Sequence, residues 1–126
     1  MKIELKRLTI KDLYKLQIIV KESIAKDARL EWPFSREIAT KFIGEFNTWG
    51  IWVNGGSLVG AIEIKPDCEV AYLIASQWQG QGIATLSVKM IKEEFADHQL
   101  FALVHPSNIA SIRVAEKANM AIKFLQ

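Results

Sequence analysis

Cysteine, proline and long hydrophobic runs are all scarce in this chain of 126 residues. The single cysteine, Cys68, excludes an internal disulfide and any cysteine-based metal site, and it fits a reducing compartment. No stretch approaches the ~18 consecutive apolar residues of a membrane helix. The N-terminal segment "MKIELKRLTIKDLYK" carries charges throughout and has no apolar core of signal-peptide length. These absences predict a cytoplasmic protein with no metal and no membrane partner.

Excess charge of one sign is also missing. The chain has 16 Lys and Arg against 14 Asp and Glu, a formal net charge of +2, and no basic block interleaved with aromatics. Such a surface predicts no nucleic-acid partner. Half of the residues are hydrophobic, which is enough for a real core, and the length suits one domain over residues 1–126.

The first half of the chain has a strand and two helices. Alternation in "KIELKRL" predicts the strand, and Thr9 followed by Asp12 resembles a capping box that opens the first helix. Pro33 interrupts the pattern, and Ser35 caps the second helix. Helical spacing assigns this second helix the apolar face Ile38, Phe42, Phe46 and Trp49.

After Gly50 the apolar period changes to two. Two strands flank Asn54-Gly55-Gly56, and a third covers residues 69–75. A helix follows over 83–96, with Ile83, Leu86, Met90 and Phe95 on its apolar side. A strand at 100–104, a short helix ending at a left-handed Asn119, and a last strand from 121 complete the chain. The connection from 69–75 to 100–104 suits a parallel crossover, so the fold class is α/β, a mixed and mostly antiparallel sheet flanked by helices.

The stretch "IASQWQGQGIATLSVKMI" places two glycines just before a helix, where free N–H groups and the helix dipole favour an anion. A nucleoside-triphosphate loop needs a lysine after Gly82, and none is there. A dinucleotide fingerprint needs a glycine where Thr85 stands. The pattern Gln/Arg-x-x-Gly-x-Gly/Ala is satisfied by Gln79, Gly82 and Ala84 and suits a pyrophosphate. A glycine turn needed only for packing remains the alternative.

Two segments carry a family resemblance: "EVAYLIASQWQGQGIA" from Glu69, and "HPSNIASIRVAEKANM" from His105. The chain resembles the GNAT superfamily of acetyl-coenzyme A-dependent N-acetyltransferases, and is most similar to the branch that acetylates ribosomal-protein N-termini. The motifs cover residues 69–120, about half of the chain. In the second segment the matching residues are Asn108, Ser111, Arg113, Val114, Glu116 and Lys117.

The resemblance implies a site for acetyl-coenzyme A. Leu73, Ile74 and Ala75 would pair with the pantetheine arm, and Asn108 and Ser111 would meet its far end. The pyrophosphate would lie on the loop and helix start formed by Gln79, Gly80, Gln81, Gly82, Ile83, Ala84 and Thr85.

The resemblance also implies the groups that act in catalysis. A backbone N–H near Leu73 and Ile74 would hold the oxyanion. Glu69 matches the family's strand glutamate and is the first candidate for the base, with Glu63 second. The family's usual tyrosine acid is replaced by Ala115, and Tyr72 is interpreted as a packing residue.

The expected acceptor is a primary amine. At pH 7 an α-amine of pKa ~7.8 is roughly one-seventh neutral, whereas a lysine of pKa ~10.4 is neutral in about one molecule in 2,500. A site with a single base, Glu69 or Glu63, and no tyrosine therefore favours peptide N-termini or small amines. The connection 29–36, which includes Trp32, is expected to help form the acceptor site, and Trp78 either fills the core or lies beside the cofactor.

One departure from the family concerns the end of the chain. Members normally have two strands after the asparagine helix, and "MAIKFLQ" suffices for one. The edge left exposed predicts a homodimer. The short C-terminus and the missing tyrosine also keep open an alternative from another class, a catalytically silent acyl-coenzyme A sensor or partner subunit.

Overall fold

The computed structural model describes residues 1–23 and 34–126. The predicted order of strands and helices is confirmed. The elements in chain order are β1 (Ile3–Lys6), the 3-10 turn η1 (Ile10–Asp12), α1 (Leu13–Ser23), α2 (Arg36–Gly44), β2 (Thr48–Val53), β3 (Ser57–Ile64), β4 (Val70–Ile74), the 3-10 turn η2 (Ser76–Trp78), α3 (Ile83–Glu94), β5 (Phe101–Val104), α4 (Ile109–Lys117) and β6 (Ala121–Phe124). No described helix is both long and apolar enough to cross a membrane.

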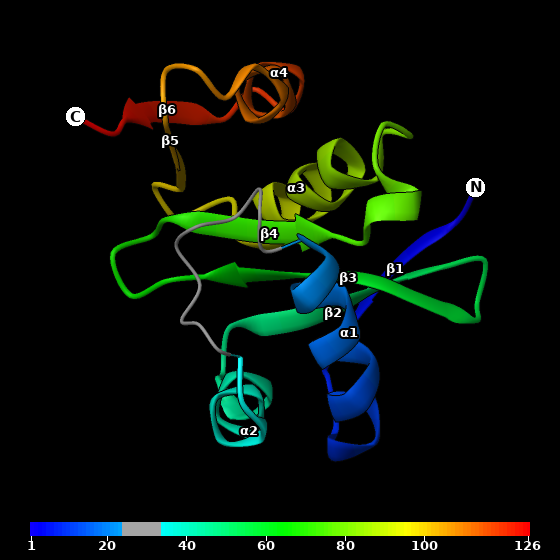
Figure 1. Ribbon diagram of the computed structural model, residues 1–126. Helices are drawn as coiled ribbons and strands as arrows, with labels where there is room; N and C mark the ends of the chain where they lie inside the picture. Colours follow the sequence, from blue (N-terminus) through cyan, green and yellow to red (C-terminus); the bar gives the residue numbers. More distant parts are fainter. Residues whose placement is uncertain (24–33) are drawn as a thin grey trace.

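The central sheet has the order β1-β2-β3-β4 and is antiparallel throughout. Figure 1 shows α3 on one face of this sheet and α1 and α2 on the other. Strands β5 and β6 form a separate parallel pair, connected by α4. This α/β architecture, a mixed and mostly antiparallel arrangement of strands with helices on both faces, is the predicted fold class.

Strands β4 and β5 are joined by backbone pairing at only one point in the described chain. Glu69 and Phe101 form an isolated parallel bridge, and the Phe101 N–H donates to the Cys68 carbonyl at 3.1 Å. Beyond this pair the two strands belong to different sheets. The predicted parallel crossover is therefore present, but the strands are hydrogen-bonded only where they begin.

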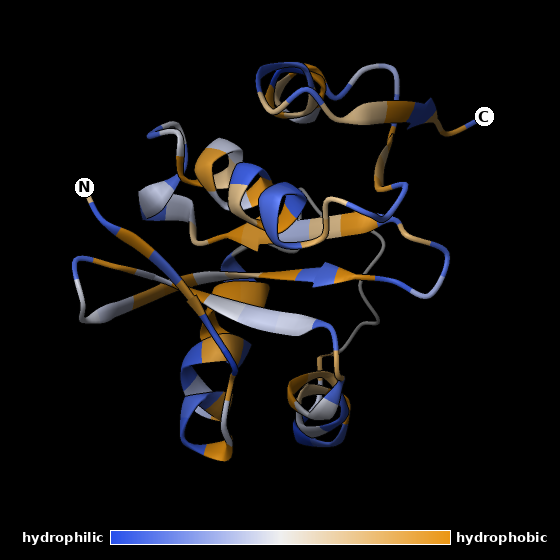
Figure 2. Ribbon diagram, turned by 180° about the vertical axis from the view of Figure 1, so that it is seen from behind, coloured by the Kyte–Doolittle hydropathy of each residue, from blue (hydrophilic) through white to orange (hydrophobic). Residues whose placement is uncertain are grey.

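Two apolar clusters hold the layers together. One lies between the sheet and α3 and includes Ile51, Ile62 and Val88; the other lies against α1 and α2 and includes Leu16 and Ala39. Figure 2 shows the hydrophobic residues concentrated on the central strands and on the helix sides that face them. Burial of this apolar surface on both faces of one sheet is the main stabilising contribution to the fold.

The predicted apolar side of α3 was partly wrong. The helix begins after Gly82 and buries Ile83, Ser87, Val88 and Ile91, whereas Leu86 is 40% exposed. Ser87 is tolerated in the core because its hydroxyl donates to the Ile83 carbonyl at 2.8 Å. Because Ser87 is polar, a prediction based on apolar residues alone does not find the side of α3 that is buried.

The predicted face of the second helix was wrong at its end. α2 stops at Gly44, Glu45 is already extended, and Phe46 is 79% exposed. Trp49 lies in β2 and packs on Phe95 of α3, with ring centroids 5.5 Å apart. The helical spacing of these aromatic residues is a coincidence that runs across a turn into a strand.

The predicted local signals at element ends are confirmed. The Asp12 carboxylate accepts the Thr9 N–H at 2.8 Å, and the Ser35 hydroxyl accepts the Ile38 N–H at 3.2 Å. Asn119 has a left-handed backbone with φ of 56°. Beyond it, β6 pairs only with β5 among the described strands, so its outer edge is the one for which a second subunit is expected; the homodimer stays a prediction.

Candidate active site

The loop between β4 and α3 depends on two glycines. Gly80 and Gly82 have φ of 78° and 82°, a left-handed conformation that side chains disfavour. A Cβ at either position would meet nothing within 4 Å. The backbone conformation, and not crowding inside the protein, therefore explains the glycines, and the space beside them is open to a ligand.

The start of α3 presents unpaired donors. Leu86 is the first residue whose N–H enters the helix, donating to the Gly82 carbonyl at 3.0 Å. Within the described chain, no N–H from Gly80 to Thr85 donates to a protein acceptor. A helix of 12 residues adds its dipole at the same point, so an anion is favoured there.

Two residues next to this loop have structural roles. The Gln79 side chain donates to the Ile74 carbonyl at 3.0 Å, which fastens the loop to the last residue of β4. Trp78 packs against both apolar clusters. Of the two interpretations left open for Trp78, the structure therefore favours the core residue.

Strand β4 approaches β3 unusually closely at Gly60. A Cβ added there would lie 2.2 Å from the Leu73 carbonyl oxygen and 3.3 Å from the Ile74 Cα. Ala75 donates its N–H to Val59 of β3 at 2.7 Å, and because strand groups alternate, the N–H and carbonyl of Ile74 face the opposite edge of β4. That edge is the side of β5. Sequence analysis missed Gly60, although a glycine inside the apolar strand "SLVGAIEI" is a known sign of close backbone approach.

Glu69 is a buried carboxylate at the start of β4, only 4% exposed. Its Oε1 lies 3.8 Å from the Lys65 ammonium, and its backbone N–H donates to the Asp67 carboxylate at 3.0 Å. The rise of a strand places its Cα about 13 Å from that of Leu73. Both side chains point to the same face of the sheet, because they are four residues apart.

Glu63, the second candidate base, lies on that same face. It is paired with Ala71, two residues along β4 from Glu69. Thr48 opposes Glu63 on β2, is buried, and has a hydroxyl with no hydrogen-bond partner among the described residues. The structure therefore brings both predicted carboxylates together on the face covered by α1 and α2, and does not choose between them.

Asn108 and Ser111 open α4. The Asn108 side-chain oxygen accepts the Ser111 N–H at 3.2 Å, so this asparagine is a helix cap. Since β4 and β5 start from a parallel pair, the segments that follow them leave at the same end of the molecule. The glycine loop and the start of α4 are therefore associated with the same end of β4 and β5.

Other predicted positions have plain structural roles or cannot be described. Ala115 is buried and Tyr72 packs against the α3 cluster. Trp32 and most of the connection 29–36 lie outside the described residues; within its described part, Phe34 is buried and Ser35 caps α2. Among the described residues, no group of three or more His, Cys, Asp or Glu is placed to hold a metal ion.

Comparison with known proteins gives a family match and similar solved structures. The model of the acetyltransferase (GNAT) domain matches residues 2–121. A GNAT-family acetyltransferase from Bacillus anthracis has a TM-score of 0.74 at 18% identity, over 94% of this chain and 79% of that one. RimL, the ribosomal L7/L12 alpha-N-protein acetyltransferase, in complex with coenzyme A, gives 0.74 at 20% identity over the same shares. None of the curated protein sequences compared with the chain matches it.

A third similar structure is the microcin C7 self-immunity acetyltransferase MccE in complex with acetyl-CoA and AMP. It has a TM-score of 0.71 at 18% identity, and covers 93% of this chain and 77% of that one. At such identities these structures establish the fold, while the match of the domain model extends over nearly the whole chain. The chain belongs to the GNAT family and is an acetyl-coenzyme A-dependent acetyltransferase.

Proposed function

We propose that this enzyme transfers the acetyl group of acetyl-coenzyme A to a primary amine, either a peptide N-terminus or a small amine, by direct attack in a ternary complex. The observation that carries the proposal is the row of backbone N–H groups from Gly80 to Thr85 with open space beside them. Similar structures agree: RimL is known with coenzyme A and MccE with acetyl-CoA. Residues 1–126 are proposed to form one domain of this kind.

The glycine loop would bind the pyrophosphate. Gln79 would act by fixing the loop, while the residues from Gly80 to Thr85 would supply donors and the helix dipole. The edge of β4 that faces β5, over Leu73 to Ala75, would pair with the pantetheine arm as an added strand. Asn108 and Ser111, at the start of α4, would contact the far end of this arm.

Acetyl-coenzyme A supplies a thioester, whose carbonyl is open to attack and from which the thiolate of coenzyme A can leave. The N–H of Ile74, on the edge of β4 away from β3, would stabilise the negative charge that develops on that carbonyl. Glu69 would take a proton from the acceptor ammonium, directly or through a water molecule, so that a neutral amine attacks. Its burial, and the aligned Leu73 on the same face, favour it over an ordinary solvated carboxylate.

Replacement of the base gives a sharp prediction. Glu69→Gln keeps the size of the side chain and removes the proton acceptor, so kcat should fall by roughly 10²–10⁴-fold while acetyl-coenzyme A still binds. Glu63→Gln is the matched variant, one strand away on the same face. Steady-state kinetics with one amine measure both. If Glu63→Gln loses the activity and Glu69→Gln retains it, the two roles must be exchanged.

Binding of the cofactor is tested by thermal unfolding with acetyl-coenzyme A, with ATP and NAD as controls. Ligand at 100 times its dissociation constant adds ~2.7 kcal/mol to the free energy of unfolding. For a domain of this size the midpoint should rise by roughly 8–15 °C, and the controls should leave it unchanged. A folded protein that shows no rise with acetyl-coenzyme A would contradict the proposed site.

An acyl-coenzyme A sensor is the second candidate function. Two observations favour it: Ala115 stands where many relatives have a tyrosine acid, and the Asn108 side chain is engaged as a cap. Thiol release measured with a broad panel of amines, corrected for hydrolysis, separates the two. An enzyme turns over with at least one amine, whereas a sensor binds the cofactor and turns over with none.

A further inference from the structure

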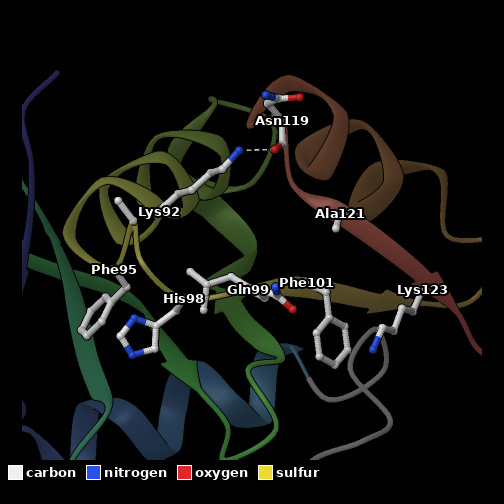
Figure 3. Close-up of a pocket in the computed structure, with 10 residues that line it drawn as sticks. Lys92, Phe95, His98, Gln99, Phe101, Asn119, Ala121 and Lys123 are labelled. Carbon is white, nitrogen blue, oxygen red and sulfur yellow. Dashed lines mark hydrogen bonds between the residues drawn. The ribbon is translucent and has the colours of Figure 1, made fainter.

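A groove of about 560 Å³ lies between the C-terminal end of α3 and the β5–β6 pair, away from the glycine loop at the other end of α3. Figure 3 shows the side chains that line it. The residues used below are Lys92, Phe95, His98, Gln99, Phe101 and Lys123. None of them belongs to the residues assigned above to the cofactor or to the base.

The charge of this groove has one sign. Two lysines line it, and no Asp or Glu does so among the described residues. The Lys123 ammonium lies 4.0 Å from the centroid of the Phe101 ring, and the Lys92 ammonium donates to the Asn119 carbonyl at the end of α4. Both cations are thus held in place by the protein, and the groove favours an anionic group.

The groove is connected to the proposed base through one of its lining residues, on the face of the sheet opposite α3. Phe101 lines it and is bridged to Glu69, and paired residues of neighbouring strands direct their side chains to the same face. On its other side Phe101 is paired with Ala121 of β6, the strand that carries Lys123. Two strand spacings of ~4.8 Å separate β4 from β6, so the anion site lies on the order of 10 Å from Glu69.

We propose, resting on the proposed function, that this groove binds an anionic group of the acceptor and that Lys123 determines its specificity. The acceptor is a primary amine with a carboxylate or phosphate on the order of 10 Å away. An extended chain advances ~3.3–3.6 Å per residue, so a peptide with an acidic residue at its second or third position fits. A polyamine does not, because it would place positive charge against Lys123.

The test uses three peptide amides that differ only in their charge: Ala-Asp-Glu-Ala, Ala-Asn-Gln-Ala and Ala-Lys-Lys-Ala. The wild-type enzyme should acetylate the acidic peptide with a kcat/KM about tenfold above that of the neutral one, and the basic peptide least well. The preference should shrink when ionic strength rises, because Lys123 is exposed and salt screens its charge.

Charge reversal at one residue completes the test. Lys123→Glu should raise the KM of the acidic peptide roughly tenfold with kcat unchanged, since an attraction is replaced by a repulsion. The rise in unfolding midpoint with acetyl-coenzyme A should match that of the wild type. Lys11→Glu makes the same change of charge on the η1 turn, at an exposed position that does not line the groove, and should alter neither value.

The outcomes separate this inference from the proposed function. Equal rates with all three peptides, a preference for the basic one, or a Lys123→Glu enzyme with an unchanged KM would overturn the inference and leave the acetyltransferase intact. Turnover with no amine of a broad panel, by a folded protein that binds acetyl-coenzyme A, would overturn the proposed function, and the inference with it.

Discussion

Gly82→Val should weaken acetyl-coenzyme A binding severely while the protein remains folded. Gly82 has φ of 82°, where a side chain costs roughly 1–2 kcal/mol and a β-branched one more, so the unfolding midpoint should fall by several degrees. The valine methyl groups would also occupy the open space beside the N–H groups of the loop. An affinity loss of at least 100-fold is expected, and at the ligand concentration used above it would reduce the stabilisation from ~2.7 to about 0.4 kcal/mol.

The chain offers a matched control at the hairpin. Gly55 has φ of 76°, and a Cβ there would also meet nothing within 4 Å. Gly55→Val should therefore lose a similar amount of stability and keep the full rise in midpoint with acetyl-coenzyme A. The difference between the two variants measures the ligand contact without the backbone strain. If the unfolding midpoint of Gly82→Val rises with acetyl-coenzyme A as much as that of the wild type, the loop is only a turn and does not bind the cofactor.

Gly60→Ala should damage both stability and catalysis. The new Cβ would lie 2.2 Å from the Leu73 carbonyl oxygen, a backbone atom that cannot move without moving β4. Overpacking of this kind costs about 1–3 kcal/mol or more. It also displaces the edge of β4 proposed to hold the oxyanion, and a shift of about 1 Å at such a site can lower the rate 10²-fold. Denaturant unfolding and kcat/KM of the same preparation measure the two effects.

Gly44→Ala is the comparison for this variant. Gly44 is the last residue of α2, has no positive φ, and would place its Cβ in open space. An alanine there should leave the activity unchanged and stabilise the protein by up to about 1 kcal/mol, because it restricts the unfolded chain. If Gly60→Ala proves as harmless as Gly44→Ala, the close approach of β3 and β4 is not needed for the site.

Local signals explain how much of the fold could be predicted. Caps such as Ser35, the Asn54-Gly55-Gly56 turn and the left-handed Asn119 act within a few residues, so the sequence displays them directly. The end of α2 could not be found in this way. The spacing of Phe42, Phe46 and Trp49 stays helical across a boundary that tertiary packing sets, where Trp49 meets α3.

The same distinction between local signals and tertiary packing applies to the candidate site. Its glycine loop is a contiguous motif, so the sequence displays it directly. The shared face of Glu63 and Glu69 depends on strand register, and the groove combines residues from α3, β5 and β6. Groups assembled from distant segments leave no periodic trace in the sequence, so neither feature could be predicted without the structure.

The single bridge between Glu69 and Phe101 has a consequence for cooperativity. Among the described residues, the β5–α4–β6 unit is joined to the central sheet by one backbone pair. It is joined to α3 by the hydrogen bond from Lys92 to the Asn119 carbonyl and by side-chain packing, chiefly of α4 on α3. Local opening of this unit therefore requires less free energy than global unfolding. A ligand held between β4 and β5 would touch both parts, and its binding free energy would add directly to the cost of that opening. Binding of such a ligand would thus make the central sheet and the β5–α4–β6 unit unfold together, as one cooperative unit.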